Sequence, residues 1–222
     1  KKLLAIFLDI LYNKERNNIG NGGIFMDNKI ITISREFGSG GRIIGEKLAE
    51  RLGVSFYDKL IIAKVAEHTG LAEDFIEKKG EYSPSKSMFA YGWVARNSMG
   101  ESLEDYLYSV QRKIILELAE KESCVIVGRC ADAILKNHPK RINVFICSDE
   151  QHKLEKIQRV YEKSPNEAKR MMRDMDKKRS INYNYYTDQK WGDVRHYTMA
   201  LNSGELGYDK CVELIAAAAN NL

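Results

Sequence analysis

The fold is decided by the stretch Lys29-Ile30-Ile31-Thr32-Ile33-Ser34-Arg35-Glu36-Phe37-Gly38-Ser39-Gly40-Gly41-Arg42. Its first six residues form a short β-branched run, which predicts a buried strand. A glycine-rich turn follows, and beyond Arg42 apolar residues recur at helical spacing until Gly53, a residue type that often ends helices. Strand, glycine turn and helix in this order open a βαβ unit, so the stretch predicts an α/β protein.

The glycine turn also predicts an anion-binding site. Glycines let consecutive backbone N–H groups curve around an anion, and the following helix directs its positive end at the same point. Arg42 at the helix start can add a bidentate phosphate contact. Aligned with the common loop G-x-x-x-x-G-K-[ST], the chain has Arg35 at the first glycine, Gly41 at the lysine and Arg42 at the serine or threonine. Because three positions depart, a plain glycine turn remains the alternative.

The remaining apolar runs predict a doubly wound sheet. The run at 124–128 is almost purely apolar, as is typical of a parallel strand covered on both faces. Strands alternating with helices predict an open sheet with a crevice at the carboxyl ends of the strands. Further strands are expected at 54–58, 142–147 and 196–201, and helices at 42–52, 59–80 with a break at Gly70, 101–121, 132–135, 149–186 and 208–219.

Composition restricts the classes of function. The 222 residues are 44% hydrophobic, which suits one domain with a real core. Thirty-five Lys and Arg against 31 Asp and Glu give a net charge of only +4, so we expect no nucleic-acid partner. No apolar run is long enough to cross a membrane. Four cysteines without metal-ligand spacing predict no metal site and reduced thiols, hence a cytoplasmic protein.

Residues 1–25 are expected to be an extension outside a single domain at 26–222. An apolar helical stripe and the turn-rich segment 17–23 precede Met26, and core-like sequence begins only after it. One hypothesis is that Met26 is the natural start and that residues 1–25 are not native. The alternative is a real N-terminal helix that packs on the body or on a second subunit.

Three blocks carry a resemblance to a known family. Ile33–Arg42, then Phe56-Tyr57-Asp58, then Val127-Gly128-Arg129 resemble the bacterial cytidylate-kinase-like family, over about residues 29–219. The resemblance implies a three-layer P-loop kinase-like fold: a parallel five-stranded sheet flanked by helices. It also implies a helical acceptor-binding insertion at 59–100 and a helical lid at 150–190.

The resemblance assigns the site residues. In true cytidylate kinases a glycine-arginine-aspartate step holds the acceptor phosphate, and here Gly128-Arg129 matches while Cys130 replaces the acid. The Asp176–Arg179 segment is similar to the Asp-x-x-Arg element of their lid, and Asn202-Ser203 stands where they have an acid and a serine or threonine. The implied catalytic residues are Arg42, Arg129 and Arg179; the implied nucleotide-binding residues are Gly38, Ser39, Gly40, Gly41, Arg42 and Arg173; the implied substrate-binding residues are Asp58 and Arg129.

Each assignment has a structural alternative. A salt bridge to Asp58 would also satisfy Arg129, and solvent exposure would explain Arg173 and Arg179 on a polar helix. Asp58 can instead cap the helix that starts at Lys59, or bind magnesium through water. Tyr183, Tyr185, Tyr186 and Trp191 are read as packing rather than as a base-stacking platform.

The function that the resemblance implies is phosphoryl transfer from ATP, with Mg²⁺, to a nucleoside monophosphate such as CMP. Two alternatives remain, because Gly41 replaces the lysine and Cys130 and Asn202 replace two acids. One is a nucleotide- or phosphate-binding regulatory module without turnover, and the other is a kinase for a small metabolite that is not a nucleotide. The expected partners are a nucleotide and a small-molecule acceptor, and a homodimer is left open.

Overall fold

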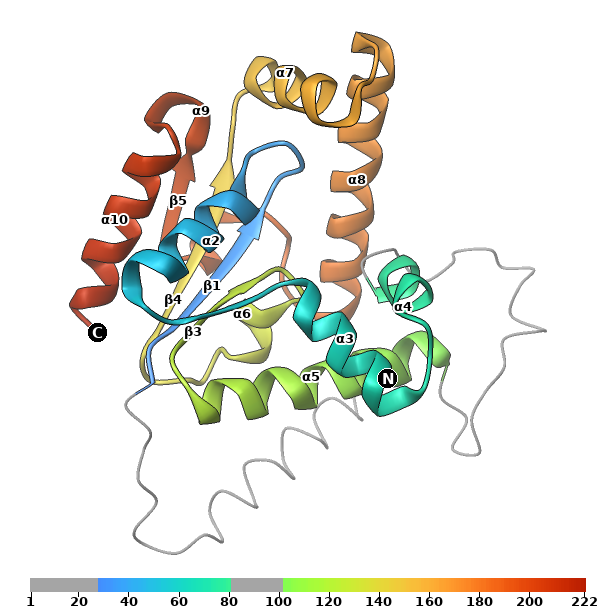
Figure 1. Cartoon of the computed structure of the whole chain (residues 1–222), viewed down its shortest axis with the longest axis vertical. Coiled ribbons are helices and arrows are strands. Elements are labelled where there is room, and N and C mark those ends of the chain that lie inside the picture. Colours follow the sequence, from blue (N-terminus) through green and yellow to red (C-terminus); the bar gives the residue numbers. More distant parts are fainter. Residues whose placement is uncertain (1–27, 81–101) are drawn as a thin grey trace, which may run out of the picture.

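The computed structural model describes residues 28–80 and 102–222 of the chain (Figure 1). The extension expected at 1–25 and the second half of the expected acceptor insertion therefore lie outside the described residues. Within the described residues, no helix combines the length and the apolar character that crossing a bilayer requires.

The centre of the molecule is a parallel sheet of five strands in the order β2-β3-β1-β4-β5. β1 pairs with β3 on one side and with β4 on the other, so Ile33 stands opposite both Val127 and Val144. This arrangement confirms the predicted parallel five-stranded sheet. The strands are β1 (Ile30–Arg35), β2 (Ser55–Tyr57), β3 (Cys124–Val127), β4 (Arg141–Cys147) and β5 (Met199–Asn202).

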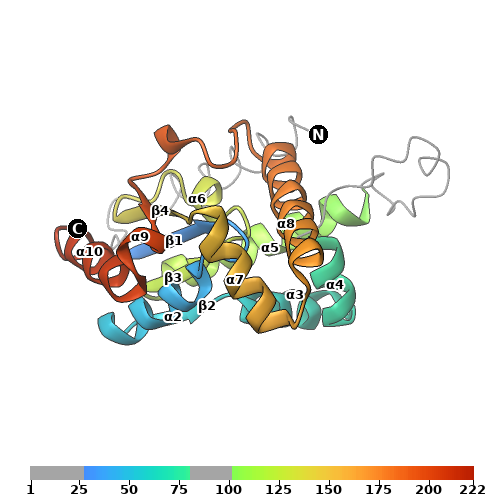
Figure 2. The same cartoon turned by 90° about the horizontal axis from the view of Figure 1, so that it is seen from above.

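Helices cover both faces of the sheet, which makes three layers (Figures 1 and 2). Side chains of a strand alternate between faces, so Ile31 and Ile33 pack against α2 (Gly41–Leu52) and α10 (Tyr208–Asn220). Ile30 packs on the other face with α3 (Lys59–Thr69), α4 (Glu73–Gly80), α5 (Leu103–Lys121) and α6 (Ala131–Ile134). The break predicted at Gly70 is confirmed as the left-handed C-cap of α3.

Two helices, α7 (Glu150–Tyr161) and α8 (Pro165–Tyr186), occupy the segment 150–190 for which a lid is predicted. Figure 1 shows α7 beyond the end of the sheet toward which β4 points. A capping box between Ser164 and Glu167 starts α8, which explains why the long helical pattern at 149–186 is two helices. Their shared apolar cluster includes Phe37, so the glycine loop packs against both helices.

The last strand is shorter than predicted. It begins at Met199, not at His196, because Val194–His196 forms a 3₁₀ turn. The Asp193 carboxylate accepts a hydrogen bond from the backbone N–H of Arg195 and so favours the turn. The strand pattern of the apolar residues did not reveal this local competition. α9 (Ser203–Leu206) follows β5 directly.

Candidate functional site

The loop between β1 and α2 has the conformation that an anion nest requires. Gly38 and Gly40 have φ of 86° and 84°, a region that side chains disfavour. Gly40 is the N-cap residue of α2 and offers no side chain that could accept a hydrogen bond from the first-turn N–H groups. These amides and the positive end of the helix point where a phosphate would bind.

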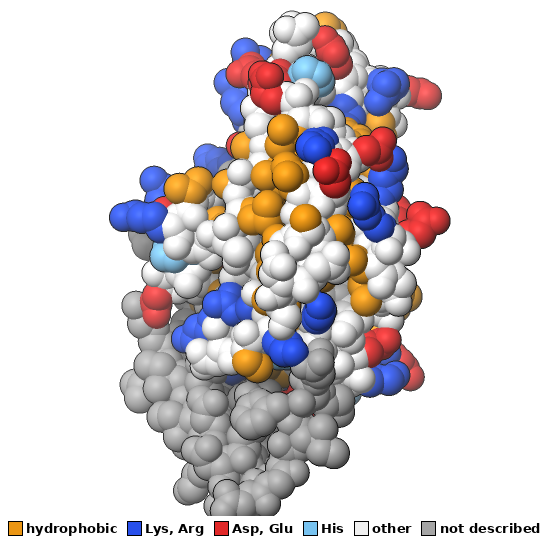
Figure 3. Space-filling view, turned by 90° about the vertical axis from the view of Figure 1, so that its left-hand side faces the viewer, with side chains coloured by type: hydrophobic (Ala, Val, Ile, Leu, Met, Phe, Trp, Pro, Cys, Tyr) orange, Lys and Arg blue, Asp and Glu red, His pale blue; other side chains and the backbone are white. Residues whose placement is uncertain are grey.

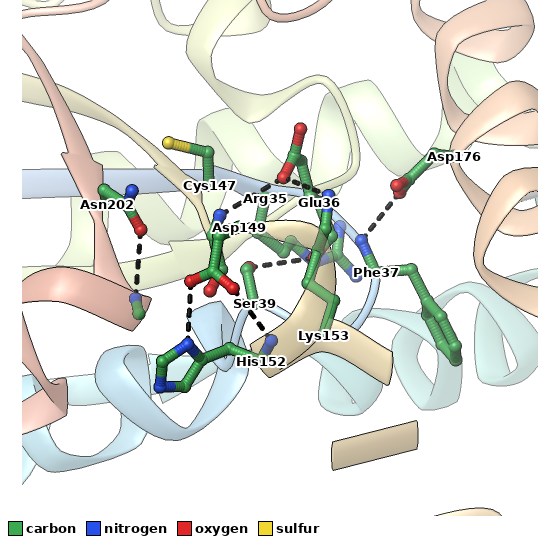
Figure 4. A network of polar contacts seen from close by, with 12 residues as sticks. Arg35, Glu36, Phe37, Ser39, Cys147, Asp149, His152, Lys153, Asp176 and Asn202 are labelled. Carbon is green, nitrogen blue, oxygen red and sulfur yellow. Dashed lines mark hydrogen bonds and ion pairs between the residues drawn. The ribbon is translucent and has the colours of Figure 1, made fainter. Parts of the chain in front are cut away.

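Polar contacts from the far end of the chain hold the loop (Figure 4). The Glu36 carboxylate accepts from the Lys153 ammonium at 2.8 Å and from the Ser148 N–H at 3.2 Å. The Ser203 hydroxyl donates to the Ser39 carbonyl at 2.6 Å, and the Ser39 hydroxyl donates to the Glu36 carbonyl at 2.9 Å. Helices α7 and α9 therefore fix the shape of the loop.

Helix α8 also contacts the loop. The Asp176 carboxylate accepts from the Phe37 N–H at 2.6 Å, and the Arg179 guanidinium donates to the Arg35 carbonyl at 3.2 Å. The Asp-x-x-Arg element thus brings Arg179 to the loop. Burial raises the pKa of Asp176 to about 6, although the Phe37 N–H and Arg179 act to lower it.

Asp176 gives the fold a pH dependence that can be measured. Because its pKa is higher when folded, Asp176 favours folding below about pH 4, and this contribution is lost as the pH rises through about 6. The two-unit shift corresponds to at most about 3 kcal/mol. We expect Asp176→Asn, which keeps an acceptor for the Phe37 N–H, to raise the free energy of unfolding at pH 7.5.

Urea unfolding at pH 4 and pH 7.5 checks this expectation, with exposed Asp174→Asn as the matched control. The gain should fade toward pH 4, where Asp176 is protonated in the folded state and becomes partly protonated in the unfolded state as well. An Asp176→Asn variant that is less stable than the wild type at pH 7.5 would contradict the inference that burial disfavours the ionised Asp176 carboxylate.

Arg129 lies two residues after β3, which pairs with the loop strand β1, and is only 6% exposed. Its Nη1 is fully buried and has no hydrogen-bond partner among the described residues. Its backbone has φ of 60°, and its carbonyl accepts from the Gln111 amide at 3.2 Å. A buried guanidinium nitrogen without an acceptor is costly, so this position favours an anionic ligand.

Asp58 does not satisfy Arg129, because it pairs with Arg42. The Arg42 Nε donates to the Asp58 carboxylate at 2.8 Å. Asp58 precedes α3 but makes no side-chain hydrogen bond to the start of this helix. The alternative that the Asp58 side chain caps α3 is therefore wrong. Both predicted site residues are thus brought together, at the start of α2 and the end of β2.

The predicted Mg²⁺ has no resident ligand set here. Ordinary P-loops offer magnesium a serine or threonine hydroxyl at the position of Arg42, and a guanidinium cannot ligate a cation. The Ser39 hydroxyl is committed to a carbonyl, and no cluster of three metal-ligating side chains occurs in residues 28–80 and 102–222. These residues therefore do not fit a resident magnesium ion.

A cavity of about 280 Å³ lies beside the loop, on the side of α7 and α10. Gly38, Ser39, Lys156 and Tyr208 are among its lining residues. The Lys156 ammonium donates to the Tyr208 hydroxyl at 2.8 Å. A Cβ on Gly40 would lie 2.5 Å from the Tyr208 ring. The absence of a side chain at position 40 therefore lets Tyr208 pack against the loop and line the cavity.

Several site features were not predicted. In the sequence, no pattern separates Glu36, Lys153, Lys156 and Tyr208 from other polar residues. Arg173 is exposed, and its Nε donates to the Lys169 carbonyl of its own helix, so it is not gathered at the loop. On the α10 side of the surface, basic and acidic side chains are interspersed rather than forming one basic patch (Figure 3).

Three of the four aromatic residues read as packing, Tyr183, Tyr186 and Trp191, contact other side chains, whereas Tyr185 is exposed. Tyr186 stacks on Tyr108 with ring centroids 4.0 Å apart. Tyr183 donates to the buried Asp132 carboxylate at 2.7 Å, and Trp191 packs edge-on against Phe145.

Comparison with solved structures defines the fold class as that of P-loop kinases. Shikimate kinase from Acinetobacter baumannii in complex with shikimate has a TM-score of 0.50 at 16% identity, covering 89% of this chain and 96% of that one. Shikimate kinase from Bacteroides thetaiotaomicron has a TM-score of 0.52 at 15% identity, covering 86% and 98%. At this identity the likeness concerns the fold alone.

A family model narrows the class. The model described as the cytidylate kinase-like family matches residues 30–205, and the chain belongs to this family. An uncharacterized protein from Eubacterium ventriosum ATCC 27560 has a TM-score of 0.68 at 29% identity, covering 88% of this chain and 100% of that one. A search of curated proteins found no match.

Proposed function

We propose that the chain is a kinase that transfers the terminal phosphoryl group of ATP to a small acceptor carrying a phosphate, such as CMP. The observation that carries this proposal is the buried Nη1 of Arg129, which lacks a hydrogen-bond partner among the described residues. A phosphate monoester is an anion that a guanidinium can bind through two parallel hydrogen bonds. Family membership supports the same reaction class.

The donor side is supported by the loop and the cavity beside it. The uncapped start of α2 suits the phosphates of a nucleotide, and the adjoining 280 Å³ has room for part of the nucleoside. Ser39 and Gly38 belong to both features. A magnesium ion would arrive as part of the MgATP substrate.

The reaction needs positioning and positive charge more than covalent help from the protein. An acceptor phosphate oxygen forms a bond to the γ-phosphorus while the bond from that phosphorus to the β–γ bridging oxygen breaks, and ADP leaves. In this proposal Arg129 orients the acceptor, the loop holds the donor, and Arg42 and Arg179 supply charge next to the loop. The pair Arg42–Asp58 and the lid contact of Arg179 hold these groups in place.

A coupled ADP-release assay with separate acceptors tests the proposal. CMP, UMP, AMP and a phosphorylated sugar form one arm, and shikimate, which lacks a phosphate, forms the other. We expect turnover in the first arm, with the nucleotide preference reporting the base pocket. ADP release with shikimate but with no phosphate-bearing acceptor would contradict the role of Arg129.

A second candidate is a nucleotide-binding module without turnover. It is favoured by Gly41 in place of the lysine and by the Asp176 carboxylate on the Phe37 N–H, which occupies a loop amide. Calorimetry separates the two candidates, since this module would bind ATP while every acceptor leaves ADP release at its background rate.

A further inference from the structure

Positions 35 and 41 of the loop have exchanged their usual residues. The common P-loop pattern has glycine at its first position and lysine six residues later. Here the first position is Arg35 and the later one is Gly41. This pair of positions therefore still provides one long cationic side chain, but that side chain belongs to residue 35 and not to residue 41.

Packing explains why the two positions cannot both carry a side chain. A Cβ on Gly41 would lie 2.6 Å from the Cβ of Arg35 and 3.0 Å from its Cγ. The 2.6 Å approach is well inside van der Waals contact between carbon atoms. Lysine at 41 and arginine at 35 thus compete for one space, and here arginine fills it.

The Arg35 side chain runs toward the end of β3. A Cβ on Gly128 would overlap the Arg35 Nη1 and lie 3.0 Å from the Arg35 Cζ. Gly128 has φ of 74°, and it immediately precedes Arg129. Gly41 therefore makes room for the start of the Arg35 side chain, and Gly128 makes room for its guanidinium. The guanidinium lies beside Gly128, the residue that precedes Arg129.

We propose that Arg35 is a catalytic residue that supplies the charge the loop lysine usually gives to the transferring phosphoryl group. The inference rests on the proposed kinase function, because it places Arg35 between a loop-bound donor and an acceptor on Arg129. The guanidinium stays protonated and donates hydrogen bonds to the γ-phosphoryl oxygens while one P–O bond breaks and the other forms. The Arg179 contact to the Arg35 carbonyl fixes the residue from the lid.

Binding measurements test Arg35 without requiring turnover. Arg35→Met keeps much of the side-chain volume and removes the charge. We expect calorimetry to show about 10- to 100-fold weaker ATP binding, with ADP affinity within about threefold of the wild type, because the contact is to the γ-phosphate. Arg51→Met, an exposed position near the end of α2, is the matched control. Equal effects on ATP and ADP, or none, would overturn the proposal.

Restoring the common pattern provides the second arm. Arg35→Gly alone should lower kcat by about 100-fold or more. The double variant Arg35→Gly/Gly41→Lys should have a kcat at least about tenfold higher than that of Arg35→Gly. Gly41→Lys alone should lower kcat, because the new side chain would overlap Arg35. A double variant no more active than Arg35→Gly would overturn the exchange.

The two hypotheses fail differently. A wild-type protein that turns over no acceptor, combined with a selective loss of ATP binding in Arg35→Met, would reject the kinase function and retain the γ-phosphate contact. Full turnover in Arg35→Met with unchanged ATP affinity would reject the role of Arg35 and retain the kinase function.

Discussion

Arg129→Met is expected to lower kcat/KM for the acceptor by about 10²- to 10³-fold and, at the same time, to stabilise the protein without ligands. In the proposed mechanism, the catalytic loss follows from removing the group that orients the acceptor phosphate. The stability gain, about 1–3 kcal/mol, follows from removing a buried nitrogen that lacks a partner among the described residues. Acceptor kinetics and urea unfolding measure the two effects separately.

These opposite signs separate a ligand-binding arginine from a structural one. A structural arginine would lose stability together with activity, because its truncation would leave a partner unpaired. Arg51→Met serves as a charge-matched control that should change neither quantity strongly. An Arg129→Met variant that is both active and destabilised would show that this guanidinium holds the fold together.

Gly40→Ala is expected to destabilise the protein by about 2–4 kcal/mol and to abolish measurable ATP binding. Part of the cost is the left-handed backbone, with φ of 84°. The other part is overlap, since the new methyl group would lie 2.5 Å from the Tyr208 ring. Relief of this overlap must move either Tyr208 or the start of α2, and both belong to the proposed donor site.

Gly53→Ala is a matched control at the other end of the same helix. Gly53 also has positive φ, 64°, but a Cβ there would meet nothing within 4 Å. It should therefore cost only about 1–2 kcal/mol and leave ATP binding intact. Equal loss of ATP binding in both variants would mean that helix strain, and not the loop, controls the nucleotide site. Thermal unfolding and calorimetry provide the two readouts.

The sheet was predictable because its signals are local. β-branched apolar runs such as 124–128 and helix-ending glycines such as Gly53 report their own structure, and alternation of strands and helices predicts parallel pairing. The shorter β5 was missed because a single side chain, Asp193, favours a turn where the strand pattern began.

The site was predictable only in part because its contacts join distant segments. Motif and resemblance singled out the loop, Arg129 and the Asp176–Arg179 element as candidates. The pairing of Arg42 with Asp58 and the space shared by Arg35 and Gly41 depend on side-chain directions, which spacing along the chain does not give. The sequence shows that residues 35, 41 and 42 differ from the common P-loop pattern. It does not show that the side chain at position 35 requires glycine at position 41.

The most direct test is ³¹P NMR of the purified protein with MgATP and CMP, followed by the other phosphate-bearing acceptors. We expect ATP signals to be replaced by those of ADP and of an acceptor diphosphate, in equal amounts, because the acceptor phosphate on Arg129 attacks the γ-phosphorus. Release of inorganic phosphate alone, or a product with a new phosphate ester on a hydroxyl, would contradict transfer to a phosphate held by Arg129.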